Sequence, residues 1–129
     1  MTFNINTALA VGLGGAFGAI SRFYIGLQVV KYFPHEIPFA TLFVNLLGSF
    51  IIGILVALFL HFSPTDTLRG FLVTGFLGAL TTYSTFAIES YVLLGNNFWY
   101  GILNILLNLL GTISCAALGY KLVTYILKF

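Results

Sequence analysis

The sequence predicts an all-α integral membrane protein with four spanning helices. Of the 129 residues, 60% are hydrophobic and only 6% are charged, whereas soluble domains carry roughly 25% charged residues. Four apolar segments reach the length of about 20 residues that a bilayer-spanning helix needs. Short polar or aromatic stretches separate them. We therefore expect one domain over residues 1–129, with spans at about 5–30, 38–60, 68–94 and 98–127.

The composition argues against several other classes of protein. A net charge of +2 is too small to indicate nucleic-acid binding. The single cysteine, Cys115, cannot form an internal disulfide and lacks the partners of a zinc site. His35 and His61 fall in predicted loops, and the spans contain neither a nucleophile–His–acid set nor a metal-type cluster. We therefore do not expect an enzyme or a nucleic-acid partner.

The first span predicts a close helix–helix contact. Gly14 and Gly18 form a GxxxG pattern, and small residues at this spacing let helix backbones approach each other in lipid. Arg22 follows on the same side, although an arginine inside a span is costly unless it is solvated or paired. Two interpretations of Arg22 stay open: it snorkels to the membrane surface, or it lines an aqueous vestibule that collects anions.

The second span has a polar stripe of small residues, formed by Thr41, Asn45, Gly48, Ser49 and Gly53. Asn45 matters most because an amide buried in lipid without partners would be costly. Two roles for Asn45 remain open: an interhelical hydrogen bond that holds the fold, or a donor that faces a pore.

The fourth span repeats this pattern with Asn104, Asn108 and Thr112, each four residues apart. Three hydrogen-bonding side chains on one helix face predict a polar track through the bilayer, because a packing face more often uses only glycine, alanine and serine.

The third span contains the segment Gly75–Phe86, GFLGALTTYSTF, which is poorly suited to a continuous helix. We expect the helix to open near Gly78–Thr82. Backbone left open at membrane depth needs protein or water to receive it, and such breaks tend to mark ion sites. Exposed carbonyls are ligands for a hard cation such as Na⁺. Tyr83 and Phe86 then share one face, and their ring edges would attract an anion weakly.

Glu89 is the only acidic residue well inside a predicted span. An intramembrane carboxylate is a candidate functional group. The alternative is that Glu89 pairs with Arg22 or with a hydroxyl group.

The positive charges give almost no orientation preference. Arg69, Lys121 and Lys128 lie on one predicted side, against Lys31 and at most Arg22 on the other. Because topology follows the Lys/Arg bias, we expect insertion in both directions and antiparallel pairing. The alternative is that a weak bias is still sufficient. Four helices alone enclose little aqueous space, so transport would need an oligomer, most commonly a two-fold dimer.

Neutral donors and aromatic edges inside the membrane suit a small, strongly hydrated anion. With that in mind, the chain resembles the Fluc (CrcB) fluoride channels along essentially its whole length. The resemblance rests on GGAFGAISRFY at Gly14–Tyr24, TLFVNLLGSFIIG at Thr41–Gly53 and GFLGALTTYSTFAIE at Gly75–Glu89. The third motif is the most specific of the three.

The resemblance implies an antiparallel, dual-topology homodimer in the cell (plasma or inner) membrane. Its two pores would export fluoride passively and so lower cytoplasmic fluoride. A structural Na⁺ at the dimer axis would be held by the carbonyls of Gly78 and Thr81. The residues implied along the fluoride path are Arg22, Thr41, Asn45, Tyr83, Ser84, Thr85, Phe86, Glu89, Asn108 and Thr112.

Two positions depart from the family pattern. Tyr83 stands where relatives usually have phenylalanine, which adds a hydroxyl donor and bulk. Ala116 stands one helical step beyond Thr112, where relatives often have a hydroxyl. We therefore expect a polar track that is shorter than usual or filled by water.

Two other functions compete with this interpretation. A small multidrug exporter also has four spans, but it needs a membrane-embedded carboxylate in its first span, and this span has none. A scaffold protein would use its polar faces only to bind helices, which leaves the TTYST segment unexplained. Composition alone would also allow coupled transport.

Overall fold

The computed structural model describes residues 3–128, and all of its elements are helical. Three long helices are α1 (Ile5–Tyr32), α2 (Phe39–Phe62) and α6 (Phe98–Leu127). Between α2 and α6 the chain forms a further long segment from four consecutive elements. These are α3 (Asp66–Arg69), the π-helix η1 (Gly70–Leu77), α4 (Gly78–Leu80) and α5 (Tyr83–Asn96).

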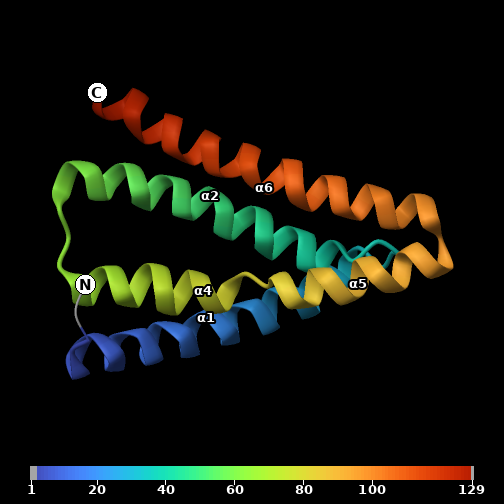
Figure 1. The fold of residues 1–129 in the computed structure, drawn as a ribbon, viewed down its shortest axis with the longest axis horizontal. Coiled ribbons are helices and arrows are strands. Elements are labelled where there is room, and N and C mark those ends of the chain that lie inside the picture. Colours follow the sequence, from blue (N-terminus) through green and yellow to red (C-terminus); the bar gives the residue numbers. More distant parts are fainter. Residues whose placement is uncertain (1–2, 129) are drawn as a thin grey trace.

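Four segments are long and apolar enough to cross a membrane. Their ends lie within two residues of the predicted spans, because the length of an apolar run is read directly from the sequence. Both chain ends and the connection between α2 and α3 lie at one end of the bundle (Figure 1). The chain is therefore a multi-pass protein with an even number of crossings.

The helix ends follow local sequence. The side chain of Asn4 accepts a hydrogen bond from the N–H of Asn6 at 2.8 Å and caps α1. The side chain of Asn97 caps α6 through the N–H of Tyr100 at 3.3 Å. Helix α2 ends at Phe62; its C-cap residue Ser63 has a left-handed φ of 45°, and Pro64 follows directly.

Glycines bring the helices into close contact. A Cβ added to Gly14 or Gly18 on α1 would overlap carbonyl oxygens of η1. A Cβ added to Gly53 on α2 or Gly119 on α6 would overlap the backbone of the opposite helix in the same way. The expected packing role of the GxxxG pattern is thus confirmed, with η1 as its partner.

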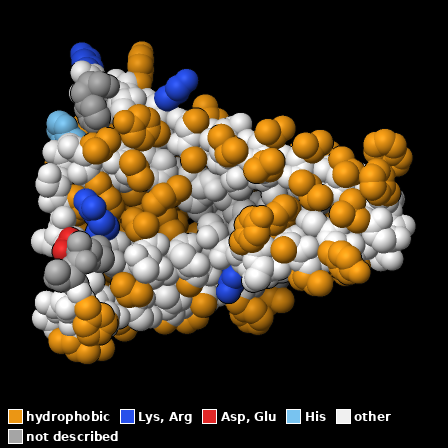
Figure 2. All heavy atoms as spheres, viewed as in Figure 1, with side chains coloured by type: hydrophobic (Ala, Val, Ile, Leu, Met, Phe, Trp, Pro, Cys, Tyr) orange, Lys and Arg blue, Asp and Glu red, His pale blue; other side chains and the backbone are white. Residues whose placement is uncertain are grey.

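Large apolar side chains cover the outside of the bundle (Figure 2). The few charged side chains on this face gather mainly at the end where the chain termini lie (Figure 2). Exposed leucine and phenylalanine side chains, such as Leu9 and Phe17 on α1, are well solvated by lipid tails but not by water. The surface therefore agrees with a membrane-embedded protein.

Candidate functional site

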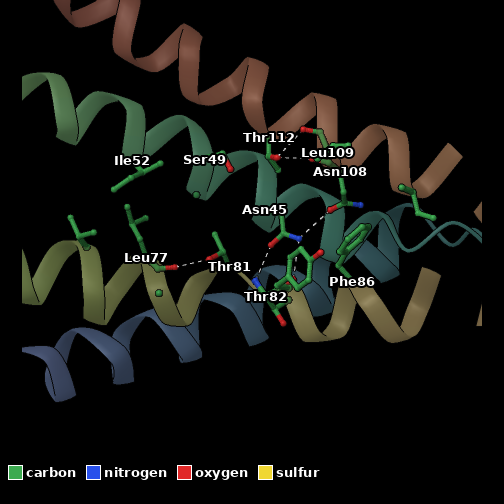
Figure 3. A pocket seen from close by; sticks show the side chains of 15 residues that line it. Asn45, Ser49, Ile52, Leu77, Thr81, Thr82, Phe86, Asn108, Leu109 and Thr112 are labelled. Carbon is green, nitrogen blue, oxygen red and sulfur yellow. Dashed lines mark hydrogen bonds between the residues drawn. The ribbon is translucent and has the colours of Figure 1, made fainter. Parts of the chain in front are cut away.

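A groove of about 480 Å³ lies between α2, the third segment and α6. Figure 3 shows polar side chains from all three segments pointing into it. Among the predicted site residues, those that line the groove are Asn45, Gly78, Thr81, Tyr83, Phe86, Asn108 and Thr112. Residues from three separate motifs of the sequence therefore meet in one hollow.

The helical backbone is interrupted beside this groove, between α4 and α5. Thr81 has φ −83° and ψ 160°, and Thr82 has φ −150° and ψ 114°, so both are extended. The side chain of Thr82 then starts α5 as its cap, accepting the N–H of Thr85 at 3.3 Å. A threonine pair suits this position because its hydroxyls can bond nearby backbone groups.

Asn45 receives the backbone of Thr82. The Thr82 N–H donates to Oδ1 of Asn45 at 2.8 Å, and Nδ2 of Asn45 donates to the Thr82 carbonyl at 3.2 Å. In a continuous α-helix that N–H would bond to the carbonyl of Gly78 instead. One amide side chain on α2 thus bonds both backbone polar groups of an extended residue.

Asn45 also continues into a chain of buried amides. Its Nδ2 donates to Oδ1 of Asn108 at 3.1 Å. Nδ2 of Asn108 donates to Oδ1 of Asn104 at 3.2 Å, and Nδ2 of Asn104 donates to the hydroxyl of Ser90 at 2.9 Å. Both donors of Asn45 are therefore bonded to protein groups, as the interhelical interpretation predicts. Asn45 nevertheless lines the groove as well.

Arg22 reaches the interruption from α1. Its Nη1 donates to the carbonyl oxygen of Thr81 at 3.4 Å, and the side chain is half-buried. Arg22 therefore does not pair with Glu89, which was one of the expected alternatives. Its position places a positive charge next to a carbonyl that lost its helical partner.

Tyr83 and Phe86 form an edge-on pair at the start of α5. Their ring centroids lie 5.4 Å apart with an interplanar angle of 64°, so the expected shared face is confirmed. Tyr83 is 80% exposed, whereas Phe86 is half-buried. In the described part of the chain, no hydrogen bond is formed by the Tyr83 hydroxyl.

The hydroxyls around these rings have different surroundings. Thr112 donates to the carbonyl of Asn108 at 2.6 Å, and the hydroxyl of Thr85 bonds that of Thr82 at 2.9 Å. Ser84 and Thr85 are exposed and lie outside the groove lining. The predicted polar track on α6 is therefore largely bonded within the protein.

Glu89 and Thr41 form a separate pair. The Thr41 hydroxyl donates to Oε1 of Glu89 at 3.0 Å, so Glu89 pairs with a hydroxyl. Oε2 of Glu89 is buried and has no hydrogen-bond partner among the described residues. Glu89 borders a second hollow of about 640 Å³, together with Glu36 and Pro38. The carboxylate therefore lies next to the groove and does not line it.

Ser90 is the polar residue that sequence reasoning overlooked. It is 5% exposed and lies directly after Glu89, the only acidic residue well inside that span. The signal that was available is the spacing of Asn104 and Asn108, because a buried amide stripe must find partners on a facing helix.

Comparison with known proteins adds a family to this geometry. Residues 9–120 match the family described as CrcB-like protein, Camphor Resistance (CrcB). A protein of Sulfurimonas denitrificans named fluoride-specific ion channel FluC is 47% identical over 124 residues, which is 95% of this chain and 96% of that protein.

Two further proteins with the same name are similar over most of the chain. The one from Methanococcus maripaludis is 50% identical over 113 residues, covering 86% of this chain and 90% of that protein. The one from Legionella pneumophila is 40% identical over 121 residues, covering 92% and 90%. The matched family consists of ion channels and not of enzymes. Because the match covers most of the chain at 40 to 50% identity, the chain belongs to the CrcB (FluC) family.

Proposed function

We propose that this chain is a fluoride-selective channel that exports fluoride passively across the cell membrane and so lowers cytoplasmic fluoride. The observation that carries this proposal is the groove, where the interrupted backbone, the Tyr83–Phe86 pair and the amide of Asn45 meet. Family membership supports it, since the relatives are named for fluoride. It also weighs against a drug exporter or a scaffold.

The groove is open along one side, which supports assembly with a second copy. Gly78 and Tyr83 are exposed there, and Ser84 and Thr85 are exposed next to it. Lipid cannot hydrogen-bond to carbonyl or hydroxyl groups, so these groups need another surface against them. An antiparallel homodimer would cover both grooves and form two pores, and the near-balanced positive charges are compatible with insertion in both directions.

The third span would then be functionally broken at Thr81–Thr82. In that arrangement an anion in the groove meets the ring edges of Tyr83 and Phe86, which attract it without holding it tightly. The donors of Asn45 are bonded to protein groups. Its role would be to hold the interrupted backbone in place, while the hydroxyls of Ser49 and Tyr83 in the groove lining would be free to donate to fluoride.

The residues at the break fit a structural Na⁺ in part. The Thr82 N–H points to Asn45, which leaves the Gly78 carbonyl without its usual helical partner. Carbonyl oxygens are suitable ligands for a hard cation. The Thr81 carbonyl also qualifies, but it already accepts a hydrogen bond from Arg22. Gly78 and Thr81 of two chains would hold the ion, which would neutralise carbonyl dipoles at the dimer axis.

The direct test is fluoride efflux from liposomes loaded with fluoride or with chloride. Purified protein should release fluoride far faster than chloride. Fluoride release equal to that of protein-free liposomes would refute the channel proposal. Equal rates for both anions would refute selectivity alone.

Orientation needs its own test. A tag at the C-terminus should be accessible from both faces of the membrane in intact and permeabilised vesicles. The matched control is a variant with added lysines near Lys121 and Lys128, which should orient in one direction only. If the unmodified protein shows its tag on one face, the antiparallel dimer is wrong.

A further inference from the structure

The chain of buried amides ends at two residues outside the groove lining, Asn104 on α6 and Ser90 on α5. Asn104 is 0% exposed and Ser90 is 5% exposed. Neither lines the groove, yet hydrogen bonds of 2.9 to 3.2 Å connect them through Asn108 to Asn45.

The extended backbone at Thr82 determines which way each side-chain amide in this hydrogen-bonded row must face. A backbone N–H only donates and a carbonyl only accepts, so Thr82 requires Oδ1 of Asn45 on its N–H and Nδ2 on its carbonyl. The second hydrogen of that Nδ2 then points to Asn108, which must present its Oδ1. A flipped Asn45 would place two donors or two acceptors opposite each other.

The same constraint passes from Asn108 to the far end. With its Oδ1 on Asn45, Asn108 turns its Nδ2 toward Asn104, where it meets both the carbonyl and Oδ1. Asn104 must therefore turn its own Nδ2 toward Ser90, whose hydroxyl accepts. A hydroxyl can accept or donate, so Ser90 closes the chain without leaving a buried polar atom unpaired.

We propose that Asn104 and Ser90 are positioning residues of the ion path, which rests on the function proposed above. They orient Asn108 and, through it, Asn45, so that the extended backbone at Thr82 is held beside the groove. Packing alone would not need this arrangement, since an aliphatic side chain would fill the space without polar atoms that need partners. The two residues act through another amide and do not touch the ion.

The test is Asn104→Leu, examined by two independent measurements. The first is the NMR spectrum of side-chain amides in protein labelled with ¹⁵N-asparagine, in which Asn45→Asp identifies the Asn45 signal by its loss. Asn104→Leu should shift the signals of both Asn108 and Asn45, although the donor bonds of Asn45 go to Thr82 and Asn108 and not to Asn104. The second is fluoride flux, which should fall about tenfold together with the preference for fluoride over chloride.

Leu93→Ala is the matched control, because it removes a buried side chain one turn from Ser90 on the same helix without altering the amide chain. It should leave the Asn45 signal in place. If Asn104→Leu does not fold, Ser90→Ala tests the same row of amides with a smaller change. Ser90→Thr keeps the hydroxyl, so its Asn45 signal and its fluoride flux should match those of the unmodified protein.

The outcomes separate this inference from the channel proposal. An unchanged Asn45 signal in both Asn104→Leu and Ser90→Ala would refute the proposal that Asn104 and Ser90 orient Asn45. A shifted signal with unchanged flux and selectivity would overturn their role in the ion path. If the unmodified protein passes no fluoride, the channel proposal fails, while the spectrum still tests whether Asn104 and Ser90 orient Asn45.

Discussion

Two contacts hold this bundle together by different means. Helix α1 meets η1 through Gly14 and Gly18, with glycine directly against backbone carbonyls. Near the groove, Asn45 on α2 bonds Asn108 on α6, and Asn104 on α6 bonds Ser90 on α5. Lipid tails are as apolar as leucine, so helices in a membrane associate by close packing or by hydrogen bonds. This chain uses the first between α1 and η1, and between α2 and α6 it adds the second to the glycine packing of Gly53 and Gly119.

The difference teaches where the backbone can be left open. The contact of Gly14 and Gly18 with η1 requires only that these two residues carry no side chain. The backbone of η1 stays helical along this contact. The amide contact supplies donors and acceptors, and the extended residues Thr81 and Thr82 lie on that side. An interruption in lipid needs such partners, so the amide side is the one on which an ion path can form.

The largest effect should come from Asn45→Asp, which replaces the donor group of this side chain with an acceptor. A carboxylate would face the Thr82 carbonyl and Oδ1 of Asn108 without a donor, which should cost about 3 kcal/mol or more in free energy of unfolding. Fluoride flux should be lost and the thermal unfolding temperature in detergent should fall. Asn96→Asp, at an exposed site on α5, is the control and should keep both. Normal flux in Asn45→Asp would remove Asn45 from the path.

A slightly smaller effect is expected for Gly18→Ala in the glycine contact. The added methyl group overlaps the carbonyl oxygen of Phe76, which is backbone and cannot rotate away, so stability should fall by about 3 kcal/mol. Gly12→Ala is the matched control, since a Cβ at Gly12 meets nothing within 4 Å and alanine favours helix. Thermal unfolding of both variants measures the difference. Equal stability would mean that α1 and η1 can move apart at no cost.

The smallest effect should come from Tyr83→Phe, which removes a hydroxyl that has no partner in the described chain. Stability should change by less than about 0.5 kcal/mol, as at other exposed sites. Fluoride flux should stay within about threefold, because the ring edge remains while one donor is lost. A large loss of stability would show that the Tyr83 hydroxyl is a structural group like Asn45. A large loss of flux alone would make it the main donor to fluoride.

The spans could be predicted from sequence to within two residues because apolar length is a local property. The partners of polar residues could not. From the sequence, Arg22 could lie at the membrane surface or in an aqueous vestibule. Its contact with the Thr81 carbonyl depends on a fold that joins residues 59 positions apart. The two roles of Asn45 also stayed open, since the stripe on one helix does not reveal that Thr82 and Asn108 use both donors.

The winding of η1 had no signal in the sequence at all. Its π-helical turns from Gly70 to Leu77 pack closely against Gly14 and Gly18 of α1, which lie far earlier in the sequence. Propensity and hydrophobic period do not distinguish π from α winding over eight residues. The predicted opening of the third span therefore came from residue types in Gly75–Phe86, while the geometry just before it remained unforeseen.

That winding has a consequence for how the chain tolerates change in length. Each residue of an α-helix rotates the chain by about 100° around its axis, and a π-helical turn holds more residues than an α-helical one. Because the π turns already hold surplus residues, the loss of a single residue between Gly70 and Leu77 is absorbed by a return to α winding, and Thr81, Thr82 and the aromatic pair keep nearly the same azimuth. The α-helical residues Gly78–Leu80 have no such surplus, so a deletion there would turn the residues that follow by about 100°.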